Sequence, residues 1–204
     1  MQSKLHNRGE HVQRQPKGTA GMCRYSKTRQ SAARSIMRGI LLIGIIFLGY
    51  HSTAEANGPS IQQVDYQDGI PRDIRQYFDQ VGAEFNICPE LMEAMAYRES
   101  RFKPKVTNGN HYGLMQVNVK THAERIKKYG WTAEDMFDPY KNITVAADYL
   151  AELYEEYGDD DPIVLNIYSG NWKAVTAYKE NGFLTYYVKD VLTRSAEYER
   201  IHGK

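Results

Sequence analysis

Residues 89–117 read PELMEAMAYRESRFKPKVTNGNHYGLMQV. The first half opens with a proline, which is favoured in the first turn of a helix, and its apolar residues recur at helical spacing. Glu99 stands four residues after Met95 and three before Phe102, so a helix would project its side chain from the apolar face. The pattern therefore predicts a helix that carries one carboxylate on its buried side.

A carboxylate on an apolar helix face has chemical consequences. Partial removal from water disfavours the charged form and raises the carboxyl pKa. A carboxylic acid that stays protonated near neutral pH can donate its proton to a glycosidic oxygen. On the helix alone, a Glu that pairs with an arginine or caps a neighbouring loop is the commoner case. The sequence around Glu99 separates these two interpretations.

Helical periodicity dominates the chain on both sides of Glu99. Residues 103–119 are expected to form a loop with one short extended piece, because they contain Pro104 and two glycines. Asn142 is expected to cap the longest helix, and Thr132 with Asp135 resembles a capping box for a short turn. The predicted helices cover residues 71–82, 89–102, 121–129, 142–158, a short stretch from 162, 171–178 and a final stretch from 185. The sequence predicts a single, mostly α-helical domain, α+β at most.

The N-terminal part has the features of an export signal. An apolar run over residues 39–48 follows Arg38, and the small-x-small sequence Ala54-Glu55-Ala56 comes after it. The run is half the roughly 20 apolar residues that span a bilayer, so a transmembrane anchor is the weaker alternative. Cleavage is expected after Ala56, which would place the protein outside the cytoplasm. The predicted organisation is a basic leader and signal peptide over 1–56 (signal core 37–56), a flexible lead-in over 57–69 and a catalytic domain over 70–204.

Charge and cysteine content exclude several classes of function. Residues 1–56 hold nine Lys/Arg and two Asp/Glu, whereas residues 57–204 hold seventeen and twenty-three. The folding part is mildly acidic, which argues against a nucleic-acid partner. Two cysteines make no disulfide framework, and phosphate loops and zinc spacings are absent from the sequence. Because His111 and His122 are isolated in the sequence, we expect neither a metal site nor a cofactor.

Short motifs recur in a fixed order along the chain. They are Glu99-Ser100, Gly113-Leu114-Met115-Gln116-Val117, Asp138-Pro139, Asn142-Ile143, Tyr149-Leu150, Tyr168 and Tyr187-Val188. This order and spacing closely resemble the soluble lytic transglycosylase (SLT) domain family, which shares a goose-type-lysozyme-like fold. The resemblance covers about residues 86–200. It implies a lysozyme-like helical domain with the short extended segment near its sugar cleft.

The resemblance also implies the site residues, position by position. Glu99 matches the family's catalytic glutamate. Two departures are visible: Ser169 stands where the family usually has Asn after its Tyr, and Asn110 stands where a Gly is expected. The implied substrate-binding residues are Ser100, Thr107, Gly113, Leu114, Met115, Gln116, Tyr168 and Ser169.

The implied reaction needs only one carboxylate. Glu99 would protonate the oxygen between N-acetylmuramic acid and N-acetylglucosamine in a peptidoglycan glycan strand. It would then act as base while the muramic acid C6 hydroxyl closes on C1, giving a 1,6-anhydro product without metal or cofactor. We expect the chain to act as a monomer. Glu93, the neighbouring candidate for a second carboxylate, lies far round the same helix.

Three other functions remain compatible with the sequence. A lysozyme-type hydrolase would use water as the nucleophile and leave no anhydro ring. A wall-binding module would grip glycan strands without cutting them, an alternative that Ser169 raises. An accessory of an envelope, secretion or conjugation machine would act mainly by docking.

The export signal gives the first testable prediction. Protein recovered from the envelope fraction or the medium should begin at Asn57, as read by N-terminal sequencing. A chain that still carries residues 1–36 would contradict removal of the leader and favour an anchored form.

Overall fold

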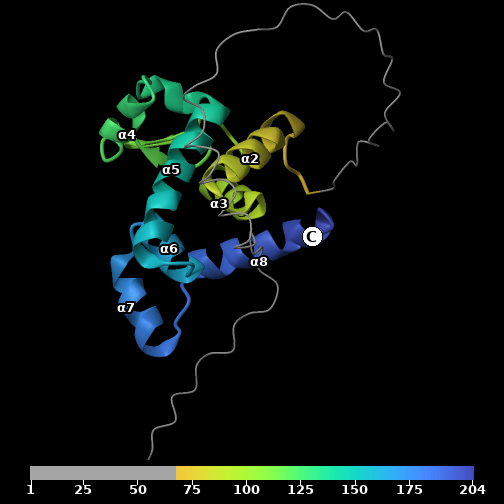
Figure 1. The fold of residues 1–204 in the computed structure, drawn as a ribbon, viewed down its shortest axis with the longest axis vertical. Helices are drawn as coiled ribbons and strands as arrows, with labels where there is room; N and C mark the ends of the chain where they lie inside the picture. The colour runs from red at the N-terminus through yellow and green to blue at the C-terminus, as the bar shows by residue number, and fades with distance from the viewer. Residues whose placement is uncertain (1–67) are drawn as a thin grey trace, which may run out of the picture.

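The computed structural model describes residues 68–204 (Figure 1). The predicted leader, the signal core, the cleavage point after Ala56 and nearly all of the predicted lead-in lie outside the described residues. Of the helices within the described part, none combines the length and the apolar character needed to cross a membrane.

The described residues form a mostly helical domain, as the sequence predicts (Figure 1). A three-stranded antiparallel sheet of two-residue strands interrupts the helices. The elements in chain order are α2 Arg72–Phe85, α3 Pro89–Ser100, β1 Thr107–Asn108, β2 His111–Tyr112, β3 Val117–Asn118, α4 Ala123–Lys128, the 3₁₀ helix η1 Glu134–Phe137, α5 Pro139–Tyr157, α6 Asp161–Tyr168, α7 Trp172–Asn181 and α8 Tyr186–Ile201.

Helix α3 is the centre of the core. It packs against α2 on one side and α8 on the other, and α2 also packs on α5. Residues 89–96 are all buried, so α3 is covered on every side rather than on a single stripe. A helix that is buried all round is typical of the middle of a domain. Two of its buried residues, Glu90 and Glu93, are acidic.

The end of α3 differs from the prediction. The sequence pattern predicts a helix to about Phe102, but the helix ends at Ser100 because Arg101 and Phe102 both adopt left-handed backbone angles, with φ of 56° and 57°. Such angles are unfavourable for residues other than glycine. Phe102 is nevertheless 7% exposed and its ring packs on Tyr97, with centroids 5.8 Å apart. Burial of the Phe102 ring stabilises these two left-handed residues, which end the helix directly after the turn that carries Glu99.

The loop after α3 contains more extended structure than the sequence predicts. In the register of the sheet, Thr107 pairs with Tyr112, and His111 pairs with Asn118. Strands of two residues are too short to show the alternation of apolar and polar side chains by which strands are predicted. The sequence therefore predicted one extended piece where the structure has three short strands.

The prediction that Asn142 caps α5 is wrong. Asp138 is the cap, and its side chain accepts a hydrogen bond from the backbone N–H of Lys141 at 3.0 Å, with Pro139 as the first helical residue. An Asp cap followed by proline begins a helix better than an Asn three residues inside it. Asn142 is fully buried, and its amide serves a different purpose.

The Asn142 amide joins three segments of the chain. Its Oδ1 accepts a hydrogen bond from the backbone N–H of Met115 at 2.8 Å. Its Nδ2 donates to the carbonyls of Tyr112 and Met136, at 2.8 and 2.9 Å. Gly113 is required beside it, because a Cβ atom there would lie 2.4 Å from Nδ2 and 2.1 Å from the Met136 carbonyl oxygen. Residues 112–115 are thus fixed against the start of α5.

Asn142→Ala should therefore destabilise the full-length chain strongly. It leaves a buried N–H and two carbonyls without their partner, and a stranded buried group costs about 1–3 kcal/mol. We expect a loss of at least roughly 3 kcal/mol in the free energy of unfolding, measured by chemical denaturation. Asn171→Ala is the matched control, since Asn171 is exposed and makes no capping bond, and it should change that free energy by less than about 0.5 kcal/mol. Equal losses in the two variants would contradict this role of Asn142.

Candidate active site

Glu99 lies half-buried in the last turn of α3, where one side chain from α8 holds it. The hydroxyl of Tyr187 donates a hydrogen bond to Glu99 Oε1 at 2.6 Å. Burial raises the pKa of the Glu99 carboxyl above its ordinary value, while the Tyr187 hydrogen bond and the charges of Arg98 and His111 act in the opposite direction. The raised pKa predicted from the helix pattern is confirmed.

The neighbouring arginine, Arg98, makes its contacts with residues of α8. Arg98 Nε lies 3.9 Å from Asp190 Oδ2 on α8, and its guanidinium lies over the ring of Tyr186, 5.0 Å from the centroid. The alternative in which Glu99 serves as an ion-pair partner has no support in this arrangement. The Glu99 carboxyl is instead held by a neutral donor, which leaves proton transfer open to it.

A small pocket lies near this carboxyl: Glu99 is not one of its lining residues, but Tyr168 and His111, which do line it, interact with Glu99 electrostatically. The charge of Glu99 is one of the causes that raise the pKa of the Tyr168 phenol, after burial. The pocket combines aromatic rings, amides and imidazoles: His111, Gln116, Val117, Asn118, His122, Val145, Ala146, Tyr149 and Tyr168 line it. Polar groups beside aromatic faces are typical of small-molecule and sugar sites.

Of the segment from Gly113 to Gln116, only Gln116 lines the pocket. The other residues of the segment lie behind the pocket wall. The side chains of Leu114 and Met115 are fully buried, so they belong to the core and form no open wall. The Met115 carbonyl accepts a hydrogen bond from the Tyr168 hydroxyl at 2.8 Å. Gln116 lines the pocket, has a left-handed φ of 49°, and donates from Nε2 to the Gly113 carbonyl at 2.9 Å. The close approach that Gly113 permits is to Asn142 and Met136.

Three predicted hydroxyl-bearing residues lie off the pocket. Ser100 is 6% exposed, and its hydroxyl donates to the Ala96 carbonyl within α3. Thr107 is exposed on β1. Ser169 is exposed, and its hydroxyl donates to the Asn166 carbonyl at 3.0 Å, at the end of α6. None of the three lines the pocket.

Other residues at the site were missed by the sequence analysis. Tyr187 is separated from Glu99 by 88 residues, and its membership of a family motif gave no indication of that contact. Tyr149 on α5 received no role at the site from the sequence, but it lies half-buried and lines the pocket. Its ring lies 4.5 Å from His122 and 5.8 Å from Tyr168, centroid to centroid. Burial lowers the pKa of His122, which keeps that ring neutral near pH 7.

Known proteins resemble this chain over about half of its length. Among relatives, X polypeptide of Escherichia coli is 32% identical over 107 residues, which are 50% of this chain and 56% of the relative. Protein IpgF of Shigella flexneri is 31% identical over 106 residues (50% and 62%), and invasion protein IagB of Salmonella typhimurium is 34% identical over 100 residues (46% and 55%). The chain thus spans between half and two thirds of the length of these relatives.

Solved structures with the same fold are larger enzymes. The 70 kDa soluble lytic transglycosylase SLT70 of Escherichia coli has a TM-score of 0.55 and 23% identity, with 63% of this chain and 24% of that chain covered. An inactive mutant of the lytic transglycosylase Slt of Pseudomonas aeruginosa has a TM-score of 0.54 and 19% identity, with 62% and 24% covered. These likenesses establish the lysozyme-like helical fold.

The family model described as the transglycosylase SLT domain matches residues 76–187. That match covers more than half of the 204 residues and includes Glu99, the pocket residues and Tyr187. The chain belongs to the SLT transglycosylase domain family, the family of the peptidoglycan lytic transglycosylases.

Proposed function

We propose that this protein cleaves the β-1,4 bond between N-acetylmuramic acid and N-acetylglucosamine in peptidoglycan and forms 1,6-anhydromuramic acid. The observation that carries the proposal is the single half-buried carboxyl of Glu99, held by the Tyr187 hydroxyl at 2.6 Å beside a polar and aromatic pocket. Besides burial, the strongest influences on its pKa are Tyr187, Arg98 and His111, none of which is a carboxylate. One group must therefore serve as both acid and base.

The proposed reaction proceeds in two proton transfers. Protonated Glu99 donates its proton to the glycosidic oxygen as the bond from that oxygen to C1 of the muramic acid breaks. The ionised carboxylate then accepts the proton of the C6 hydroxyl as O6 bonds to C1. The carboxyl is protonated again at the end, and no water is consumed. The raised pKa favours the first transfer, and the Tyr187 hydrogen bond stabilises the carboxylate that the first transfer leaves.

We assign the proposed substrate contacts by position. Gln116 and Tyr168 line the pocket and are proposed to contact the glycan, together with Tyr149. Gly113, Leu114 and Met115 are proposed to hold this edge of the site from behind. Ser100 is proposed to support Glu99 from the last turn of α3, where its hydroxyl donates to the Ala96 carbonyl. The exposed residues Thr107 and Ser169 are proposed to contact more distant parts of the glycan strand.

The proposed setting is the cell envelope. The export signal predicted over residues 37–56 favours delivery to the peptidoglycan, where the chain would act as a monomer on glycan strands. The Salmonella relative is named an invasion protein, which favours local opening of the wall for an envelope machine over bulk wall turnover. A lysozyme-type hydrolase is the second candidate. Mass spectrometry of the released muropeptides separates the two, because an anhydro product is one water lighter than a hydrolysed one.

Glu99→Gln should abolish cleavage while the fold persists. Loss of one general acid–base group costs about 10²–10⁴-fold in rate, and here the same group performs both steps. Release of muropeptides from purified sacculi is the measurement, with Glu84→Gln, on the exposed face of α2, as the matched control that keeps its activity. Near-wild-type turnover of Glu99→Gln would refute the assignment.

The same variant should not lose stability. Burial raises the pKa of Glu99 in the folded state, so its ionised form costs stability at every pH above the unfolded value of 4.5. Glutamine removes that cost, and the Tm at pH 7 should equal or exceed that of the wild type.

Tyr187→Phe should move the pH profile. The Tyr187 hydrogen bond lowers the pKa of Glu99, so its removal raises that pKa and keeps the acid protonated to higher pH. The alkaline limb of kcat/KM is expected to shift to higher pH. Tyr186→Phe, which changes an exposed neighbour on the same helix, should leave the limb in place. An unmoved limb in Tyr187→Phe would show that the contact is structural only.

A further inference from the structure

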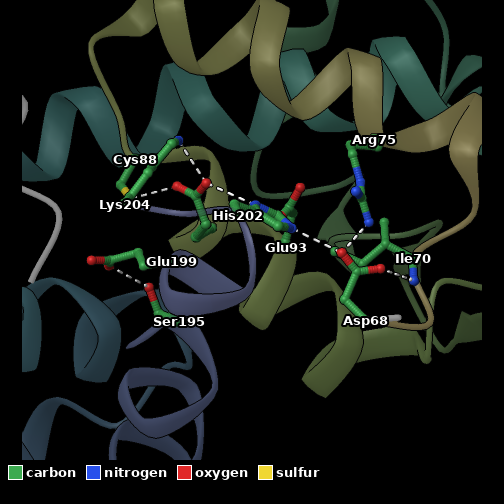
Figure 2. A network of polar contacts seen from close by, with 10 residues as sticks. Asp68, Ile70, Arg75, Cys88, Glu93, Ser195, Glu199, His202 and Lys204 are labelled. Atoms are coloured by element: carbon green, nitrogen blue, oxygen red, sulfur yellow. Dashed lines mark hydrogen bonds and ion pairs between the residues drawn. The ribbon is translucent and has the colours of Figure 1, made fainter. Parts of the chain in front are cut away.

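A second group of acidic side chains lies on α3, away from Glu99. Glu90 and Glu93 are one helical turn apart and share a face, and both are buried, at 1% and 0% exposed. His202, which follows α8, and Asp68, which precedes α2, meet them there (Figure 2). Three segments, the residues before α2, the helix α3 and the end of α8, thus bring three acids and one imidazole together.

Glu93 is the least satisfied member of this cluster. Neither of its carboxyl oxygens has a hydrogen-bond partner, although both are buried. The nearest basic nitrogen is Nδ1 of His202, 3.9 Å from Oε2. Burial raises the pKa of Glu93 to about 8. A buried polar group without a partner is costly, so a ligand that binds this carboxyl would remove that cost.

The imidazole of His202 is oriented from both sides. Its Nε2 lies 2.8 Å from Oδ2 of Asp68, whose side chain is fully buried and also bonds to Arg75 and to the backbone N–H of Ile70. Its Nδ1 lies 2.9 Å from Oε1 of Glu90. Figure 2 shows the contact from His202 to Asp68, whose carboxylate is also joined to Arg75. A histidine that ligates a metal through one nitrogen typically donates its other N–H to a carboxylate in this way.

We infer that Glu90, Glu93 and His202 form a binding site for a first-row divalent cation, with Zn²⁺ as the representative. One carboxylate oxygen from each glutamate and one ring nitrogen of His202 lie within 4.8 Å of one another. Imidazole nitrogen with carboxylate oxygen suits zinc, whereas calcium and magnesium prefer oxygen ligands alone. The ion would bind Nδ1 and leave the Nε2–H donating to Asp68.

Lys204 is the competitor of this ion. Its ammonium lies 2.6 Å from Oε1 of Glu90, and its side chain is 45% exposed. An incoming cation would displace this ammonium from Glu90 toward solvent. The thiol of Cys88, 3.2 Å from Oε2 of Glu90, holds the other oxygen of that carboxylate. A bound ion would connect the residues before α2, the first half of α3 and the end of α8. It would therefore stabilise the fold and would take no part in the reaction.

The test uses the full-length chain after treatment with a chelator. Zinc chloride is titrated by calorimetry, Tm is followed in parallel, and Co²⁺ is added separately to read the ligand field. The wild type is expected to bind one zinc ion that Glu93→Gln does not bind. A hundredfold excess over Kd should raise the wild-type Tm by about 5–10 °C. The Co²⁺ spectrum should lose its protein-bound bands in the same variant.

Glu84→Gln is the matched control, because it makes the same change on the exposed face of α2 and should keep the site. His202→Asn provides a second variant that removes the nitrogen ligand. Other histidines and Cys23 are able to bind zinc weakly. The test therefore compares the zinc stoichiometry and the Tm shift of the wild type with those of Glu93→Gln. Equal zinc stoichiometry and Tm shift in wild type and Glu93→Gln would overturn the inference. It would equally be overturned if Glu93→Gln raised the Tm while zinc affected neither protein. No readout depends on cleavage, so this result is independent of the proposed function.

Discussion

The side-chain amide of Asn142 is the contact on which the geometry of the site depends. It uses both of its polar atoms on backbone groups of Tyr112, Met115 and Met136, so one buried residue fixes the sheet, η1 and α5 relative to one another. The Met115 carbonyl then receives the Tyr168 hydroxyl, which extends the same network to α6. The pocket wall is therefore held by hydrogen bonds between segments, while apolar packing fixes α3 behind it.

Helix α3 shows how position alone separates two glutamates with the same side chain. Glu99 lies at the end of the helix, half-buried, with a neutral donor from α8. Glu93 lies in the middle of the helix, fully buried and without a hydrogen bond. Both pKa values are raised by burial. Glu99 interacts electrostatically with His111 and Tyr168, which line the pocket, so it suits proton transfer to a substrate, whereas Glu93 suits a partner that stays in the interior.

The sequence was sufficient for features that depend on neighbouring residues. It predicted the helices and the place of Glu99, and the final helix begins beside residue 185 as predicted, with Thr185 as its cap. It failed where distant segments decide the outcome. The preceding Asp-Pro pair begins α5, which frees Asn142 for contacts some 30 residues away. The contact between Tyr187 and Glu99 likewise joins separate helices, and neither contact leaves a periodic pattern. The cluster around Glu93 was missed because Asp68 and His202 come to it from segments far from α3 in the sequence.

The double left-handed turn at Arg101 and Phe102 has a consequence for tolerance to insertion. An added residue there would release the Phe102 ring from the core and unwind the last turn of α3, which carries Glu99. The turn at Gly109, between β1 and β2, is different, because an added Cβ there meets no atom within 4 Å. Sequence length can therefore vary at the tip of the sheet without redirecting the acid. New contacts to the proposed substrate are more easily acquired at that tip than next to the helix end.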